Sequence, residues 1–180
     1  MNTKTFAAVL ALAALLCSCS KEGTKLFEGS YSFKTSGIVY ARQTTDAEDT
    51  GQQEEIRVMI PTESGQMDLT PAGDDGRMKL TMNVTGGEIL VYDASVDGDS
   101  IVIDKDHRSL MFSFPAREND SDSEAVDHLV SADLDVSAEG KRYGNIILFK
   151  FYYSGTFTKD DAEYEIYDSD IDCRAKLNEE

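Results

Sequence analysis

The sequence predicts an all-β protein in which an antiparallel meander of about 8–10 strands closes into a barrel. Apolar and polar residues alternate over most of the chain, which is the period of a half-buried strand. Glycine turns separate these runs, and no segment between them has the length and 3.6-residue period of a crossover helix. A barrel is favoured over the alternative, a β-sandwich, because closure removes exposed sheet edges.

The first alternating run begins at Gly29 and changes phase at Ser36-Gly37, which predicts a bulge or a sharp bend there. Residues 106–108, Asp-His-Arg, are interpreted as a turn. The later runs are the clearer strands: 56–60, 78–84, 110–114, 130–136, 147–153 and a long last strand from 164. Glycine dipeptides are predicted to close hairpins at 75–76, 86–87, 97–98 and 139–140.

The N-terminal segment has the order of a secretory signal. Lys4 precedes an apolar run that is too short to span a bilayer, which takes about 20 residues. Leu16-Cys17-Ser18-Cys19 resembles a bacterial lipobox, which implies cleavage before Cys19 and a lipid on its sulfur. The predicted organisation is a lipoprotein signal peptide (1–18), a lipidated tether (19–28), a single β-barrel domain (29–177) and a C-terminal tail (178–180).

Charge and cysteine content restrict the partners. The chain carries 34 acidic and 17 basic residues, a formal net charge of −17, which argues against nucleic acid as a partner. Contact with the membrane is therefore expected through acyl chains on Cys19 rather than through a basic patch. Cys173 would be the one cysteine left beside that anchor, so we expect a small buried side chain and no internal disulfide.

A lipobox followed by an acidic all-β domain resembles the lipocalin-like, or calycin-like, lipoproteins of Bacteroidetes. Gly29-Ser30-Tyr31 at the first strand and 96–101, Val-Asp-Gly-Asp-Ser-Ile, at a mid-chain hairpin carry the resemblance. Lipocalins usually have Gly-x-Trp at the first strand, and here Tyr31 takes the place of the tryptophan. The resemblance implies a lipocalin-like barrel anchored in the outer membrane of the cell envelope, with its periplasmic or surface side left open.

One segment partly matches the spacing of a calcium-binding loop. Its oxygen-bearing side chains are Asp93, Ser95, Asp97, Asp99 and Asp104. The last position holds an aspartate instead of the longer bidentate glutamate, and the flanks are predicted strands. These departures favour a hairpin turn with solvated acids over a metal site. In the same segment, Asp99-Ser100-Ile101 resembles the O-glycosylation sequon of Bacteroidetes, and strand entry is the alternative role for Ser100.

No catalytic constellation, metal-ligand spacing or phosphate loop stands out, so the sequence predicts a non-enzyme without a cofactor. A barrel of this size can enclose a small apolar ligand. The candidate lining residues, equally plausible as packed core, are Met82, Phe112, Phe114, Phe149 and Phe151. Two functions stay open: a lipid-anchored, non-catalytic protein that binds a small apolar ligand, or a structural or protein/glycan-interaction module with a filled barrel. An envelope protein is the other expected partner.

Overall fold

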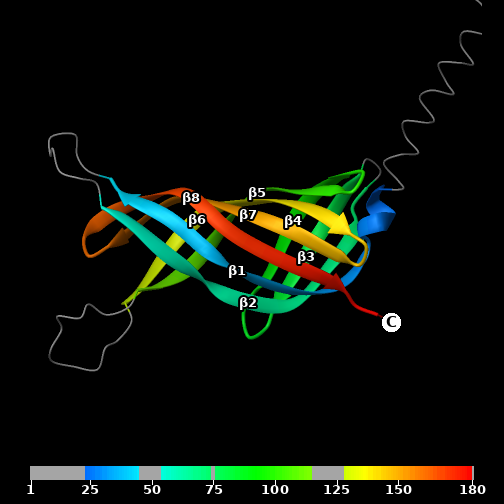
Figure 1. Cartoon of the computed structure of the whole chain (residues 1–180), viewed down its shortest axis with the longest axis horizontal. Helices are drawn as coiled ribbons and strands as arrows, with labels where there is room; N and C mark the ends of the chain where they lie inside the picture. The colour runs from blue at the N-terminus through cyan, green and yellow to red at the C-terminus, as the bar shows by residue number, and fades with distance from the viewer. Residues whose placement is uncertain (1–22, 45–53, 74–75, 115–127, 180) are drawn as a thin grey trace, which may run out of the picture.

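A computed structural model describes residues 23–44, 54–73, 76–114 and 128–179. Eight antiparallel strands form one sheet that closes into a barrel, and their order around it is the order of the sequence (Figure 1). The predicted meander barrel is therefore confirmed, with β1 paired to β2 on one side and to β8 on the other. The strands are β1 Gly29–Gln43, β2 Glu55–Pro71, β3 Arg77–Val84, β4 Ile89–Asp97, β5 Ser100–Phe114, β6 His128–Tyr143, β7 Ile146–Lys159 and β8 Ala162–Leu177.

The core occupies the inside of the barrel because alternate side chains of a strand point to opposite faces. In β3, Met78, Leu80 and Met82 are buried, whereas Lys79 between them is exposed. The other strands follow the same rule, so one hydrophobic cluster runs along the barrel. Cys173 belongs to that cluster, which confirms the prediction of a small buried side chain.

A short helix closes one end of the barrel, at residues 23–27, which the sequence assigns to the tether. Phe27 is fully buried, and Tyr31 donates a hydrogen bond from its hydroxyl to the Phe27 carbonyl oxygen over 2.8 Å. The packed domain therefore begins before Gly29. A single buried phenylalanine has no periodic neighbours in the sequence, which explains why the pattern does not reveal this helix.

Bulges change which residues face inward partway along the barrel. The predicted phase change of the first strand at Ser36-Gly37 is wrong, because Val39 and Ala41 are buried in the same phase as Tyr31. The β1–β2 register does shift there, but the extra residue lies in β2: Thr35 pairs with Glu63 and Gly37 with Ile60. A second shift separates Ile103 from Asp106 in the β5–β6 ladder. A bulge inserts an unpaired residue and reverses the facing of all residues beyond it. Ile103 therefore faces inward on one side of the β5 bulge and Arg108 on the other.

Two predicted turns are wrong. Residues 106–108 lie inside β5, and Glu139-Gly140 lies inside β6, which turns only at Gly144, with φ of 62°. A Cβ on Gly140 would come within 2.5 Å of the Phe149 ring. This glycine therefore allows β6 to lie close to the Phe149 ring. In the sequence alone, a glycine needed for such a contact cannot be told from a glycine in a turn.

Candidate functional site

The five predicted lining residues all lie inside the barrel and are at most 8% exposed. All five belong to the hydrophobic cluster of the interior, and the phenylalanine rings make two separate sets of ring contacts. The rings of Phe112 and Phe114 pack on Phe157, with centroid separations of 5.3 and 6.1 Å. The ring of Phe149 instead lies 6.1 Å from that of Phe151. The aromatic side chains therefore act as core, in two groups; Met82, which is 1% exposed, is core as well.

A polar cluster within the barrel is centred on Arg108, whose side chain is only 5% exposed. Its guanidinium donates to both carboxylate oxygens of Glu63, over 2.5 and 3.2 Å, and to the Tyr153 hydroxyl over 3.3 Å. It also donates to Glu88 Oε1 over 3.1 and 3.2 Å. The ion pair thus links β5 to β2, to β7 and to the residue that precedes β4. A bidentate arginine–carboxylate pair is among the stronger hydrogen-bonded contacts in proteins.

The pKa shifts in this cluster follow from burial and from the Arg108–Glu63 pair. Burial is the largest single influence on Arg108 and lowers its pKa, but the hydrogen bond to Glu63 and the electrostatic effects of Glu63, Tyr153 and Tyr92 together outweigh it, so the pKa of the guanidinium is raised. Burial also raises the pKa of Tyr92 and of Tyr153. The Cys173 thiol has a pKa raised to about 12, by burial first and by the charge of Glu63 second. These three groups stay neutral near pH 7, so the cluster acts as a structural link.

The sequence analysis missed Arg108 because it was interpreted as part of a turn. A usable signal was nevertheless present. Leu110, Phe112 and Phe114 share one face of β5, and extending their period of two backward places Arg108 on that same inward face. A charged residue in phase with three core residues indicates a buried ion pair, because an unpaired charge in that position is too costly.

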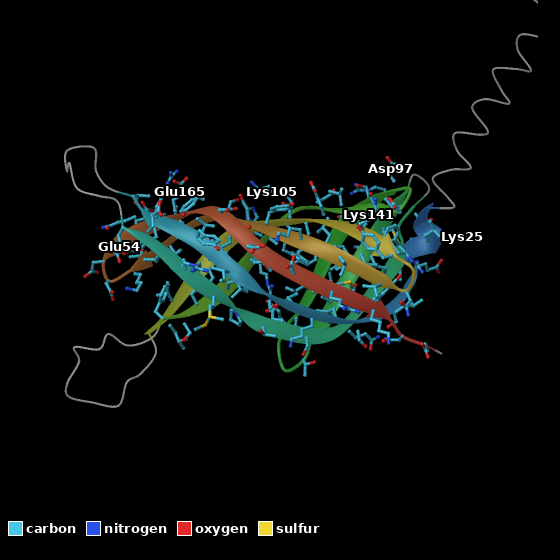
Figure 2. All side chains as sticks on the ribbon, viewed as in Figure 1. Lys25, Glu54, Asp97, Lys105, Lys141 and Glu165 are labelled. Carbon is cyan, nitrogen blue, oxygen red and sulfur yellow. The ribbon has the colours of Figure 1, made fainter. Side chains whose placement is uncertain are left out.

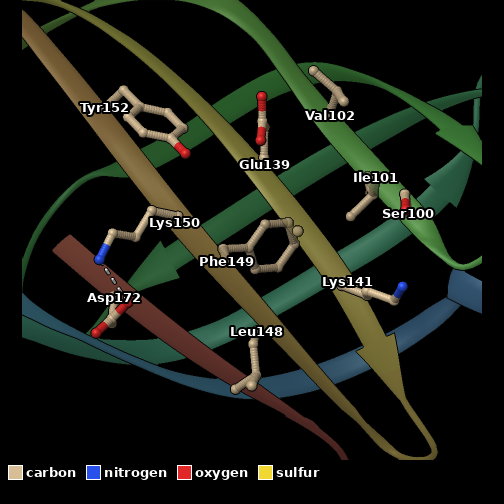
Figure 3. A pocket seen from close by; sticks show the side chains of 11 residues that line it. Ser100, Ile101, Val102, Glu139, Lys141, Leu148, Phe149, Lys150, Tyr152 and Asp172 are labelled. Carbon is tan, nitrogen blue, oxygen red and sulfur yellow. Dashed lines mark hydrogen bonds and ion pairs between the residues drawn. The ribbon is translucent and has the colours of Figure 1, made fainter. Parts of the chain in front are cut away.

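A depression of about 390 Å³ lies on the outside of the barrel and crosses β5, β6, β7 and β8 (Figure 3). Ladder pairing brings its residues together. One row runs from Ser100 through Lys141 to Leu148. A parallel row runs from Val102 through Glu139 and Lys150 to Asp172, and Tyr152 lies beyond it along β7. No sequence motif signals this site, since strand register alone makes these residues neighbours.

Gly140 forms the floor of the depression together with the inward-facing Ile101 and Phe149. Its missing side chain lets β6 lie directly on the Phe149 ring, since an added Cβ would also meet Ile101 at 2.8 Å. The outer surface is low at this point, while the side chains of Glu139 and Lys141 rise on either side (Figure 3).

The walls of the depression combine charged and apolar groups. Lys150 pairs with Asp170 and, over 3.4 Å, with Asp172, and its hydrogen bond to Asp170 raises the pKa of the ammonium. Lys141 pairs with Asp99 over 3.2 Å. Val102, Leu148 and Tyr152 are exposed and apolar or aromatic. Such a surface offers hydrogen-bond donors and acceptors beside apolar contact area, which suits recognition of a polar ligand.

The calcium candidate is laid out along a hairpin. Asp93, Ser95 and Asp97 follow one another along β4, so their spacing is about 7 Å per step and they cannot surround one ion. Asp99 pairs with Lys141, and Asp104 pairs with Arg77 over 2.6 Å. Within the described ranges no three His, Cys, Asp or Glu side chains are grouped to hold a metal.

The last two predicted sites are Ser100, the O-glycosylation candidate, and Cys19, the lipidation site. Ser100 begins β5 and lines the outer depression, so this residue and Phe149 are the two sequence candidates that the structure brings to that site. Cys19 lies outside the described residues. None of the described helical segments is long and apolar enough to cross a membrane.

No protein-family model and no curated protein matches the sequence.

Proposed function

We propose that the protein is a lipid-anchored, non-catalytic binding module of the bacterial outer membrane, with a filled barrel and a saccharide ligand on the outer face of β5–β8. The observation that carries the proposal is the content of the barrel. Its interior holds packed aromatic side chains and a buried ion pair, so the accessible binding surface is external. The outer depression provides that surface, and its volume lies within the range of small-molecule sites, about 300–1,000 Å³.

The lipobox supports the anchor. Gly23, in the closing helix, lies four residue steps after Cys19, and a chain spans at most about 3.6 Å per step. A lipid on Cys19 would therefore hold the helix end of the barrel within about 15 Å of the bilayer. Lys25, Asp97 and Lys141 lie toward that end, and Glu54 and Glu165 lie toward the opposite end (Figure 2). The depression is then close to the membrane and faces sideways.

A saccharide fits the chemistry of the depression better than a fatty or nucleic-acid ligand. A sugar ring presents C–H faces that can lie on Tyr152 and Leu148, and hydroxyls that can bond to Lys150 or Glu139. A purely apolar ligand would take these charged groups out of water without offering them a hydrogen bond in return. A net charge of −17 opposes a polyanion.

Binding of a small apolar ligand inside the barrel remains the second candidate function, and it requires the interior to open. The five lining residues would have to move from packed positions to open a cavity. Displaced core contacts cost free energy, so such a ligand would be held only if its own burial compensated for them.

The test is binding of the purified protein to an array of bacterial and host glycans, followed by calorimetry with any oligosaccharide that binds. Tyr152→Ala is expected to weaken binding about fivefold, since a ring contact contributes on the order of 1 kcal/mol. Tyr143→Ala is the matched control, because Tyr143 is equally a surface tyrosine but lies outside the depression. Binding to no glycan, or equal losses in the two variants, would contradict the proposal. A lipid retained through purification by both variants would support the interior ligand instead.

A further inference from the structure

Both lysines that line the outer depression of β5–β8 already have carboxylate partners. Lys150 pairs with Asp172 over 3.4 Å and also with Asp170. Lys141 pairs with Asp99 over 3.2 Å. An acidic group on a ligand would have to share a lysine with these carboxylates and would be repelled by them. The two lysines therefore do not form a site for an anion.

Glu139 is the fourth charged residue of the lining, and its charge is not neutralised by a neighbour. In the part of the chain that the structure describes, no ion pair or hydrogen bond engages its carboxylate. Ladder pairing places Val102 on one side of Glu139 and Lys150 on the other. The Lys150 side chain, however, points toward Asp172 and away from Glu139 (Figure 3). Since Glu139 is exposed, its carboxylate is open to solvent in the free protein.

The depression as a whole carries an excess of negative charge. The carboxylates that line it, or that pair with a lysine lining it, belong to Asp99, Glu139, Asp170 and Asp172. Lys141 and Lys150 balance two of these four charges, so two negative charges remain. A ligand that covers Glu139 takes a carboxylate out of water, which costs free energy unless the ligand offers a hydrogen bond in return. A sugar hydroxyl offers a neutral hydrogen bond, whereas an ammonium group offers a charge-assisted one, which is about twice as strong.

We infer that the ligand of this site is an amino sugar, a saccharide in which at least one ring carries a protonated amine. The inference rests on the proposed saccharide site and names the class of sugar that the site would take. The ammonium group would pair with Glu139 while the C–H face of the ring lies on Tyr152 or Leu148. Both residues flank Lys150 on the outer face of β7, so each is a diagonal neighbour of Glu139, about 7–8 Å away between Cα atoms. One sugar unit can therefore contact the carboxylate and an apolar wall together.

The charge of the ligand nitrogen or carboxyl group decides which saccharides the site discriminates. An acetylated amine is neutral, so an N-acetylated sugar keeps the ring contact with Tyr152 but cannot form an ion pair with Glu139. A sugar with a carboxyl group would add a like charge beside Glu139, and the net charge of −17 would oppose its approach. The expected order of affinity is therefore amino sugar, then neutral sugar, then acidic sugar.

The experiment is calorimetry of the purified protein with the trimers of glucosamine and of N-acetylglucosamine, in a buffer acidic enough to protonate the amines. The two trimers share their rings and linkage and differ in the charge on nitrogen. The glucosamine trimer should bind about fivefold more tightly, the effect of one exposed ion pair. This advantage should disappear in about 1 M sodium chloride, where the screening length is about 3 Å.

Glu139→Gln and Glu55→Gln form the matched pair of variants. Glu55 is also an exposed glutamate on a strand, but it lies on β2, outside the depression, and its replacement changes the net charge by the same amount. Glu139→Gln should weaken binding of the glucosamine trimer about fivefold and change binding of the acetylated trimer by less than about twofold. Glu55→Gln should change either affinity by less than about twofold.

The outcomes separate this inference from the proposed function. Equal affinities of the two trimers, no binding of the glucosamine trimer, or equal losses in Glu139→Gln and Glu55→Gln would overturn the inference. If a neutral glycan still binds in that case, and Tyr152→Ala weakens it, the saccharide site stands without the amino-sugar preference. Binding of no glycan at all would remove both.

Discussion

Replacing Arg108 by methionine tests the ion pair in the barrel most sharply. The change removes the guanidinium but keeps an apolar chain of similar length, so packing along the stem is preserved. It leaves the carboxylate of Glu63, which is 16% exposed, without the two hydrogen bonds that now satisfy it. The Tyr153 hydroxyl loses its contact with the guanidinium at the same time.

The magnitude follows from burial. Breaking a buried ion pair by removing one partner costs about 3–5 kcal/mol, because the other charge stays desolvated. Glu88 is 51% exposed, so Glu88→Gln should cost less than about 1 kcal/mol. The double variant Arg108→Met with Glu63→Met removes both charges, and we expect it to be more stable than Arg108→Met alone, because a buried ion pair and an apolar pair are often equivalent in stability.

The assay is urea unfolding followed by far-ultraviolet circular dichroism, since the chain has no tryptophan to report by fluorescence. Free energies of unfolding come from linear extrapolation, with unchanged slopes required for comparison. The reasoning would be refuted if Arg108→Met cost no more than Glu88→Gln, or if the double variant were no more stable than Arg108→Met alone.

Four further predictions concern the packed interior. Phe27→Ala should lower the free energy of unfolding by about 3–5 kcal/mol, because it removes a fully buried ring. Leu26→Ala is the control: this side chain is exposed, so its removal should change the free energy of unfolding by less than about 0.5 kcal/mol. Urea unfolding measures both variants. Gly140→Ala should lower the free energy of unfolding by about 1–3 kcal/mol in the same assay, since the new methyl group meets Phe149 and Ile101. Ser131→Ala, at an exposed position of β6, is the control. Equal stabilities of the two variants would contradict the close approach of β6 to the Phe149 ring. Cys173 should resist maleimide at about pH 8 until urea unfolds the protein, because its pKa is raised to about 12. Since the pKa values of Cys173, Tyr31, Tyr92 and Tyr153 are all raised by folding, their contribution to stability should be complete below about pH 9 and lost as the pH rises through their folded values; an alkaline urea series that shows constant stability would contradict this.

The strands were predictable because alternation is a local signal. Met78, Leu80 and Met82 reveal both the strand and its buried face without knowledge of any neighbour. The same rule predicted that Cys173 is buried. The meander order also follows from local features, since most successive strands are joined by short turns, which favour antiparallel neighbours.

Features that depend on contacts between residues far apart in the sequence could not be predicted from local alternation. Glu139-Gly140 looks like a turn in the sequence, but a glycine is needed at 140 because a side chain there would collide with the ring of Phe149. Only the pairing register of β6 and β7 brings that ring beside Gly140. The outer depression exists because four strands align Ser100, Lys141 and Leu148 in one row.

The most direct test of a filled barrel with an external binding surface is mapping of ligand contacts by nuclear magnetic resonance. The protein would be titrated with the oligosaccharide that binds most tightly on the array, and backbone amide and methyl signals would be followed. The account predicts perturbed signals from Val102, Glu139 and Tyr152, with the interior methyl of Met82 unchanged. Perturbation of Met82 together with interior signals from Phe112 and Phe151, and no change at the outer face of β5–β8, would contradict it.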